Sequence, residues 1–397
     1  MAGRLSLGGF AAAGLMRSPT SSRASVTAAA CRARVAAALR GSSSARRRFS
    51  EEWNGTDNDD ASALLETIGD VDRAPQPLPP PSPEQAAVVR SVRDRVNVVC
   101  EAVAGSGKTT TVLHCARDVP HLTFLVLTYN ARLKLTTRQR AKQLGLSNVE
   151  THSFHACAAR YYVTGCRDDE TLARLVEEDA PPRAAMRFDC LVVDEAQDMT
   201  PLLHRFVLKL LRDAGTGDGP AQMLILGDSR QSIYQFRDAD PRFLTMADRG
   251  VYALAEKPKS AAASPAWRHH TLRTSFRASP RIASFVNDAM LGFACIKASP
   301  RAHLPDGGAG APVTYMVGNA FQVASQEIAD EIEHLLSPRG GGYAPDDIFV
   351  LTPSLKGAKL NSKTPLAQLE NTLVMRCGVP VYVSLADEEE LSDALTR

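Results

Sequence analysis

The first 50 residues contain no acidic side chain and no lysine, although nine arginines fall within them. This composition, together with many Ala and Ser residues, is typical of an organelle transit peptide, and Arg47–Ser50 is similar to a mitochondrial processing site. The apolar segment of a secretory signal is missing. We therefore expect residues 1–50 to direct the chain to the mitochondrion. The nucleus or a plastid are alternative destinations, and a disordered tail is the alternative interpretation of the segment.

Beyond this segment the chain lacks any basic excess. It has 37 Lys and Arg against 44 Asp and Glu, a net charge of −7. An overall positive surface is thus excluded as the basis of nucleic-acid binding, and any such contact must use a local groove. No apolar run approaches the roughly 18 residues of a membrane-spanning helix. We therefore expect no membrane partner.

The eight cysteines form no Cys-x-x-Cys pair, which argues against a zinc site or a disulfide framework. The length of 397 residues suits about two domains of ordinary size. Residues 51–81 are acidic and then rich in proline, a composition typical of a linker. The folded part is therefore expected to begin at residue 82.

A glycine-containing turn lies between a β-branched run at Val96–Val99 and a helical segment at Val112–Ala116. A strand, a small-residue turn and a helix are the context of a phosphate-binding loop, although a chance glycine-rich turn is the alternative. Backbone N–H groups of such a loop surround phosphate oxygens. Its lysine, here Lys108, binds the β- and γ-phosphates, and the hydroxyl of the following residue, here Thr109, can ligate Mg²⁺. The predicted nucleotide-binding residues are Ala104, Gly105, Ser106, Gly107, Lys108, Thr109 and Thr110.

Three further apolar runs, Phe124–Thr128, Cys190–Val193 and Met223–Leu226, alternate with helical segments. Near-continuous apolar strands separated by amphipathic helices predict an α/β fold with a parallel sheet covered on both faces. In the helix expected at Pro201–Leu211, an apolar stripe is expected in the core: Leu203, Phe206, Val207 and Leu210.

Two carboxylates, Asp194 and Glu195, directly follow the Cys190–Val193 run. The carboxyl end of a parallel strand faces the crevice in which ligands bind. Beside a phosphate-binding loop, Asp194 can hold Mg²⁺, and Glu195 can polarise the water that attacks the γ-phosphate. An ordinary acidic helix N-terminus is the alternative interpretation.

A polar and aromatic segment follows the next strand. Gln231 is placed to sense the γ-phosphate, Tyr234 and Phe236 offer flat faces for stacking bases, and Arg237 can contact the nucleic-acid backbone. Ordinary core packing of the two aromatics is the alternative. Earlier in the chain, Gln85 either completes a capping box with Ser82 or recognises adenine through its amide.

The motifs Ala-x-Ala-Gly-Ser-Gly-Lys-Thr, Asp-Glu-Ala-Gln-Asp and Gly-Asp-x-x-Gln-Ser-Ile-Tyr-x-Phe-Arg occur in this order. They resemble motifs I, II and III of superfamily 1 DNA helicases of the UvrD/Rep/PcrA type. Pro83–Gln85 is similar to the family's Q motif, which favours adenine contact by Gln85. The resemblance also implies that Tyr129, Asn130 and His155 contact the DNA strand together with Tyr234, Phe236 and Arg237.

Leu272–Arg277 is similar to motif IV of the family. By that resemblance Phe276 packs on the adenine, and Arg277 reaches the γ-phosphate from the second domain as an arginine finger. A solvated charge before the helix start at Ser279 is the alternative for Arg277. The family's motifs V and VI do not follow, so we expect a complete first RecA-like domain and a partial second one. In the partial domain we expect strands at 312–317, 347–352 and 379–383 and helices at 321–336 and 366–377.

The resemblance implies a RecA-like P-loop NTPase with residues 82–268 as its first domain and 269–397 as a partial second domain. It implies ATP and Mg²⁺ as cofactors and a partner that is single-stranded DNA or a duplex with a single-stranded tail. The implied activity is a 3′→5′ helicase or translocase in DNA repair or recombination. For an active helicase, the given sequence would be a truncated gene model. A truncated remnant that binds ATP and DNA without unwinding and an RNA-stimulated ATPase are the alternatives.

Overall fold

The computed structural model describes residues 16–17, 77–129, 131–214, 221–253, 266–300, 310–317, 324–352, 365–379 and 381. Contacts divide the chain into two compact units. The large unit comprises residues 41–303 and 309–311, and the small unit comprises residues 1–40, 304–308 and 312–397. In the described part of the chain, no helix is both long and apolar enough to cross a membrane.

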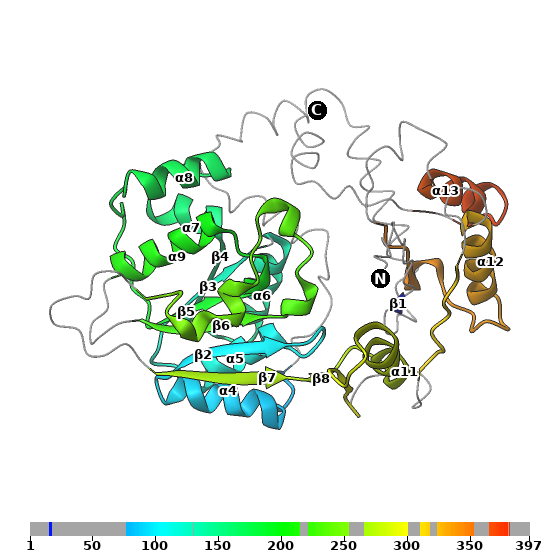
Figure 1. The fold of residues 1–397 in the computed structure, drawn as a ribbon, viewed down its shortest axis with the longest axis horizontal. Coiled ribbons are helices and arrows are strands. Elements are labelled where there is room, and N and C mark those ends of the chain that lie inside the picture. Colours follow the sequence, from blue (N-terminus) through cyan, green and yellow to red (C-terminus); the bar gives the residue numbers. More distant parts are fainter. Residues whose placement is uncertain are drawn as a thin grey trace, which may run out of the picture. The chain divides into compact units, whose positions relative to one another are not determined.

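A six-stranded parallel sheet, in the order β4-β3-β5-β6-β2-β7, forms the centre of the large unit (Figure 1). The apolar runs expected to be strands lie in it, because a parallel sheet covered on both faces needs apolar residues in succession. The strands are β2 Asn97–Ala102, β3 Phe124–Thr128, β4 Val149–Ser153, β5 Cys190–Val193, β6 Gln222–Gly227 and β7 Trp267–Leu272.

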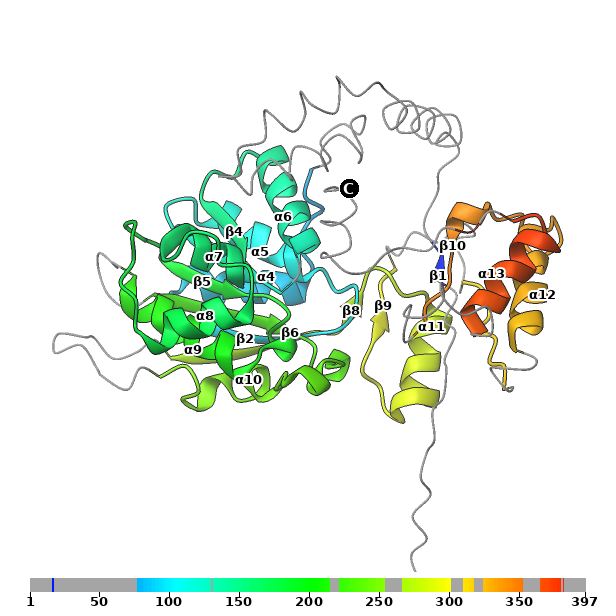
Figure 2. The ribbon, with the colours of Figure 1, turned by 90° about the horizontal axis from the view of Figure 1, so that it is seen from above.

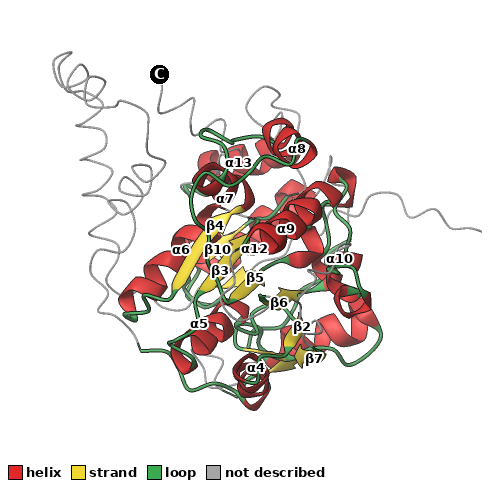
Figure 3. Ribbon diagram, turned by 90° about the vertical axis from the view of Figure 1, so that its left-hand side faces the viewer, coloured by secondary structure: helices red, strands yellow, loops and turns green. Residues whose placement is uncertain are grey.

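Helices lie on both sides of this sheet (Figure 3). Proline and hydroxyl residues start several of them: Ser82 caps α4 and Thr200 caps α9, each followed by proline at the first helical position. The α-helices of the large unit are α4 Pro83–Arg93, α5 Lys108–Asp118, α6 Ala131–Gln143, α7 Phe154–Tyr161, α8 Asp169–Glu177, α9 Pro201–Asp213, α10 Arg242–Thr245 and α11 Pro280–Ser284.

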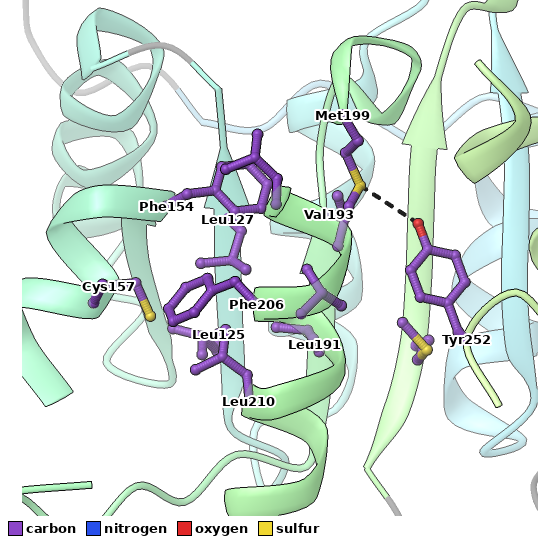
Figure 4. Close-up of a cluster of buried hydrophobic side chains, with 14 of the residues drawn as sticks. Leu125, Leu127, Phe154, Cys157, Leu191, Val193, Met199, Phe206, Leu210 and Tyr252 are labelled. Carbon is purple, nitrogen blue, oxygen red and sulfur yellow. Dashed lines mark hydrogen bonds between the residues drawn. The ribbon is translucent and has the colours of Figure 1, made fainter. Parts of the chain in front are cut away.

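Alternate residues of the strands enter two different cores. Leu191 and Val193 pack with α7, α8 and α9, whereas Cys190 and Val192 pack with α4 and α5. This alternation follows from the two-residue repeat of a strand. The expected α9 stripe of Leu203, Phe206, Val207 and Leu210 is buried, and Figure 4 shows Phe206 and Leu210 among strand side chains.

Replacing Phe206 by alanine should lower the free energy of unfolding by about 3–5 kcal/mol, because the fully buried ring would leave a cavity. Urea unfolding followed by circular dichroism measures this change. Phe349→Ala serves as the control, since that ring is exposed in the small unit. Equal losses in both variants would contradict the position assigned to Phe206.

The carboxyl ends of the strands meet at one edge of the sheet. Glu101 of β2 lies beside Gly227 of β6, and Val193 of β5 lies beside Ile225. Ala102 at the end of β2 pairs with Leu272 at the end of β7. The segments that follow β2, β5, β6 and β7 are therefore neighbours, as expected for a ligand-binding edge.

The part of the large unit after β7 contains α11, a π-helix at Phe285–Leu291, and a short parallel pair of β8 Thr274–Ser275 with β9 Lys297–Ala298 (Figure 2). The boundary that we expected between residues 268 and 269 falls inside β7. The segment resembling motif IV thus begins in the central sheet and continues within the large unit.

The small unit contains α12 Ala324–Leu336 and α13 Pro365–Met375, which pack through Ala329, Ile332, Leu369 and Leu373. Both helices were expected from the sequence. In addition, β10 Ile348–Phe349 pairs antiparallel with β1 Met16–Arg17.

The strands expected in the small unit differ from those observed. The strand expected at 312–317 is wrong, because this segment has no strand structure and its Tyr315 and Val317 side chains are exposed. In the segment 347–352 only β10 is a strand. The strand expected at 379–383 lies mostly outside the described residues. A second RecA-like sheet therefore remains a prediction.

Candidate nucleotide and nucleic-acid site

The loop between β2 and α5 has the backbone that phosphate binding requires. Gly105 and Gly107 have φ angles of +71° and +82°, which favour glycine, and α5 begins at Lys108. Ala104 and Ser106 complete the turn, and Thr109 and Thr110 follow in the first turn of α5. These positive φ angles let the chain make a tight turn directly before α5. The first N–H groups of α5 have no partner within the helix, so they are available to a ligand.

Ser106 gives an independent indication that this loop is built for a ligand. Its hydroxyl oxygen is buried and has no hydrogen-bond partner among the described residues. A buried polar atom without a partner costs free energy, so such atoms are uncommon away from functional sites. A nucleotide phosphate, which offers acceptor oxygens, fits the donors of this turn.

The two carboxylates after β5 lie beside the loop lysine. Lys108 Nζ is 3.2 Å from Glu195 Oε1, and the Asp194 side chain is only 4 % exposed. Burial, followed by the negative charge of Glu195, raises the pKa of Asp194, while Lys108 opposes the rise. A divalent cation would favour the ionised form of this acidic pair, so Asp194 fits as a Mg²⁺ ligand. Thr109, in the first turn of α5, stays a predicted second ligand.

Gln231 ends the short 3-10 turn Ser229–Gln231, directly after β6. Its side-chain Nε2 donates to Asp228 Oδ2 at 2.7 Å, and Asp228 also accepts from the backbone N–H of Arg230. Gln231 is exposed, and the hydrogen bond to Asp228 fixes its side-chain amide. Gln231 lies at the same edge of the sheet as Glu195, because β5 and β6 are adjacent strands.

The motif IV segment contacts the phosphate-binding loop directly. The Phe276 N–H donates to the Gly105 carbonyl at 2.8 Å, and the Ser275 hydroxyl donates to the Ala104 carbonyl at 2.8 Å. A β-carbon on Gly105 would lie 2.5 Å from Arg277 Cβ, so only glycine permits this approach. Arg277 is exposed at the loop and lies in the same compact unit, where the resemblance had placed it across a domain cleft.

Gln85 is engaged with protein groups on both sides of its amide. Its Oε1 accepts from the Ser82 N–H at 2.9 Å, which completes the capping box, and its Nε2 donates to the Ser106 carbonyl at 3.2 Å. The capping interpretation is therefore correct. The side chain also supports the phosphate-binding loop, and its contact with adenine stays a prediction.

The aromatic residues predicted to contact nucleic acid form a connected series. The rings of Tyr129 and Tyr234 are 5.8 Å apart, those of Tyr234 and Phe236 are 6.0 Å apart, and the Arg237 guanidinium lies 5.7 Å from the Phe236 ring. Phe236 is 77 % exposed. Core packing is thus wrong for Phe236, and Asn130 lies outside the described residues.

His155 stands apart from this aromatic series. It lies in the first turn of α7, and its Nε2 is 3.0 Å from a carboxylate oxygen of Asp169. Asp169 and Arg237 both line a hollow of about 680 Å³, together with Gln235 and Arg242. His155 is thus linked to this hollow through Asp169, and its contact with a DNA strand stays a prediction.

Two supporting residues were missed in the sequence. Glu84 accepts hydrogen bonds from the backbone N–H groups of Arg273 and Thr274, and Ser275 joins the motif IV segment to the loop carbonyl of Ala104. Glu84 and Arg273 are 189 positions apart in the chain, and Ala104 and Ser275 are 171 positions apart. No local pattern could have indicated contacts over such separations.

Gln197 was missed as a site residue although it belongs to the motif II run. It donates to Glu195 Oε2 at 2.9 Å and accepts from the Asp228 N–H at 3.0 Å. The position after Asp-Glu-Ala was the available signal, since a buried amide beside two carboxylates requires partners on both sides.

Residues 84–237 match the family model described as an AAA domain. The chain is 37 % identical over 93 residues to an ATP-dependent helicase/nuclease subunit of Latilactobacillus sakei, covering 22 % of this chain and 10 % of that protein. It is 39 % identical over 74 residues to the ATP-dependent DNA helicase UvrD2 of Mycobacterium tuberculosis, covering 18 % of this chain and 10 % of that protein.

The chain therefore spans about a tenth of the length of these curated relatives. Among solved structures, the Pif1 helicase from Candida albicans matches with a TM-score of 0.30 and 16 % identity, over 48 % of this chain and 39 % of that one. The predicted resemblance to superfamily 1 helicases is confirmed, and so is the RecA-like α/β class for the large unit.

Proposed function

We propose that this chain hydrolyses ATP and couples the reaction to movement along single-stranded DNA, as a helicase or translocase. The observation that carries the proposal is the meeting of Lys108 and Glu195 at 3.2 Å, beside Asp194, where β2 and β5 end. A lysine on a phosphate-binding loop and an acidic pair on the neighbouring loop are the parts that phosphoryl transfer to water requires.

When bound, ATP with Mg²⁺ supplies the phosphoryl group whose transfer to water releases free energy. Backbone N–H groups of the loop and of the first turn of α5, with the Lys108 ammonium, would bind the phosphates. Thr109 and Asp194 would hold the cation, and Glu195 would accept the proton of the attacking water. In the structure Lys108 is paired with Glu195. When the Lys108 side chain moves to the phosphates, a carboxylate oxygen of Glu195 becomes free to accept this proton.

Coupling to nucleic acid is supported by the segment Gln231–Arg237. The proposed γ-phosphate sensor Gln231 is only three residues from Tyr234, and the half-buried rings of Tyr129 and Tyr234 adjoin the exposed ring of Phe236. Exposed aromatic rings stack on bases of a single strand without sequence preference. A shift of this short segment can thus change both the nucleotide site and the strand contact.

The finer parts of the proposal are a 3′→5′ direction and a role in DNA repair or recombination, both taken from the family resemblance.

One experiment with two arms tests which nucleic acid stimulates ATP turnover and whether the chain separates strands. ATP turnover of the full chain is measured with single-stranded DNA and with RNA, and strand displacement is measured on duplexes with a 3′ or a 5′ tail. Stimulation by RNA alone would favour the RNA-stimulated ATPase, and DNA-stimulated turnover without displacement would favour binding without unwinding.

Replacing Phe236 by alanine should weaken binding of a single-stranded oligonucleotide by about 5- to 100-fold, because base stacking on one ring is lost. Fluorescence anisotropy with a labelled thymidine oligonucleotide measures the affinity. Tyr315→Ala is the matched control, since Tyr315 is also an exposed aromatic residue but lies in the small unit. Unchanged affinity in Phe236→Ala would remove the ring from the proposed strand contact.

We also propose a mitochondrial location, on the acid-free, arginine-rich composition of residues 1–50. A fluorescent protein fused after residue 55 tests this directly. Import into mitochondria supports the proposal, and a fusion that stays diffuse in the cytosol overturns it.

A further inference from the structure

Gln197 connects the two loops that carry the proposed catalytic base and the proposed phosphate sensor. It lies in the 3-10 turn Ala196–Asp198 after β5, and its side chain is 2 % exposed. Its Nε2 donates to Glu195 Oε2 at 2.9 Å, and its Oε1 accepts from the Asp228 N–H at 3.0 Å. One buried amide thus uses both of its ends to bridge β5 and β6.

The close approach of the bridge to β6 depends on Gly227, the last residue of that strand. A β-carbon at this position would lie 2.5 Å from Gln197 Oε1 and 3.2 Å from the Ala196 backbone nitrogen. Any larger residue would displace the amide or the strand end. The absence of a side chain at Gly227 therefore leaves the space that the Gln197 amide occupies.

Glu195 itself has a backbone conformation that needs support. Its φ angle is +55°, a left-handed conformation that residues with a β-carbon adopt at a cost. One of its carboxylate oxygens faces Lys108 and the other accepts from Gln197. Lys108 is needed for phosphate, so the Gln197 bond is the one that can persist through nucleotide binding.

We infer that Gln197 is a positioning residue that ties the orientation of Glu195 to the turn carrying Gln231. This inference rests on the proposed ATP hydrolysis. Gln231 is bonded to Asp228, Asp228 to Gln197, and Gln197 to Glu195. A displacement of the Gln231 turn by phosphate or nucleic acid thereby moves the carboxylate of the base.

The test uses two substitutions of Gln197 in the full chain. Gln197→Leu removes both hydrogen bonds, and Gln197→Glu keeps an acceptor for the Asp228 N–H but replaces the donor to Glu195 by a carboxylate oxygen that repels it. We expect kcat for ATP to fall about 10- to 100-fold in both variants, the effect of losing one hydrogen bond to a charged group, with KM within about threefold.

Hydrogen exchange at the Asp228 amide, measured by mass spectrometry without nucleotide, separates the two ends of the bridge. Exchange should be faster than in the wild type for Gln197→Leu and unchanged for Gln197→Glu. Gln222→Leu is the matched control. Gln222 is also buried, at 1 % exposure, but it donates to the Val96 carbonyl at the opposite end of β6, so kcat should stay at the wild-type value.

A double-mutant cycle with Gln231→Ala completes the test. If the hydrogen-bonded path couples the two residues, the losses in kcat of Gln197→Leu and Gln231→Ala should not multiply in the double variant. Wild-type turnover with an unaltered kcat in Gln197→Leu, an equal loss in Gln222→Leu, or multiplying losses would overturn this inference alone. Absence of turnover in the wild type would overturn the proposed function and, with it, this inference.

Discussion

Replacing Glu195 by glutamine should reduce ATP turnover by about 100- to 10,000-fold, the range in which a positioned general base contributes. The amide keeps the size of the side chain but cannot take a proton from water. Nucleotide affinity should remain close to the wild-type value, because Glu195 faces Lys108 without forming part of the phosphate-binding loop. Phosphate release and fluorescent-nucleotide binding measure the two quantities separately.

Glu150→Gln is the control for this substitution. Glu150 is a half-buried carboxylate that accepts hydrogen bonds from His152 and Tyr161 at the edge strand β4, away from the phosphate-binding loop. Its loss should affect stability and leave turnover of the folded protein unchanged. Turnover by Glu195→Gln within about threefold of the wild type would exclude Glu195 as the base.

Replacing Lys108 by alanine should lower kcat for ATP by about 100- to 1,000-fold, as for the loss of one preorganised electrostatic group. In contrast to Glu195→Gln, this variant should also bind nucleotide more weakly, since the ammonium contacts the phosphates in the ground state as well. Isothermal titration with a slowly hydrolysed ATP analogue measures the affinity.

Lys209→Ala is the matched control for removal of a buried lysine. Lys209 of α9 is paired with Asp213 of the same helix and with Asp179, which follows α8, so its loss should destabilise the fold without lowering turnover of the folded protein. If Lys108→Ala bound and hydrolysed ATP normally, the loop between β2 and α5 would not be the phosphate site.

The strands and the edge that carries the site could be predicted from sequence because their signals are local. The segment 124–127 is apolar at successive positions, Asp194 directly follows the run Cys190–Val193, and Asp228 follows the strand β6 that ends at Gly227. A parallel sheet then brings these ends together without further information. The distance between Lys108 and Glu195 shows the result of this arrangement.

Contacts between distant segments could not be predicted in the same way. The pairing of Glu84 with the backbone at Arg273 and the bridge made by Gln197 depend on how folded segments meet. The strand expected at 312–317 failed for a related reason. β-branched and aromatic residues favour a strand only where a neighbouring strand or packed face receives them, and Tyr315 and Val317 are exposed.

The most direct test of coupled ATP hydrolysis is the steady-state turnover of the full chain, titrated with a thymidine oligonucleotide at saturating ATP and Mg²⁺. We expect turnover to rise with oligonucleotide until the strand site is filled, and to stay at the background rate in Glu195→Gln at every concentration. Wild-type turnover that equals the Glu195→Gln background, or that does not respond to the oligonucleotide, would contradict ATP hydrolysis coupled to a DNA strand.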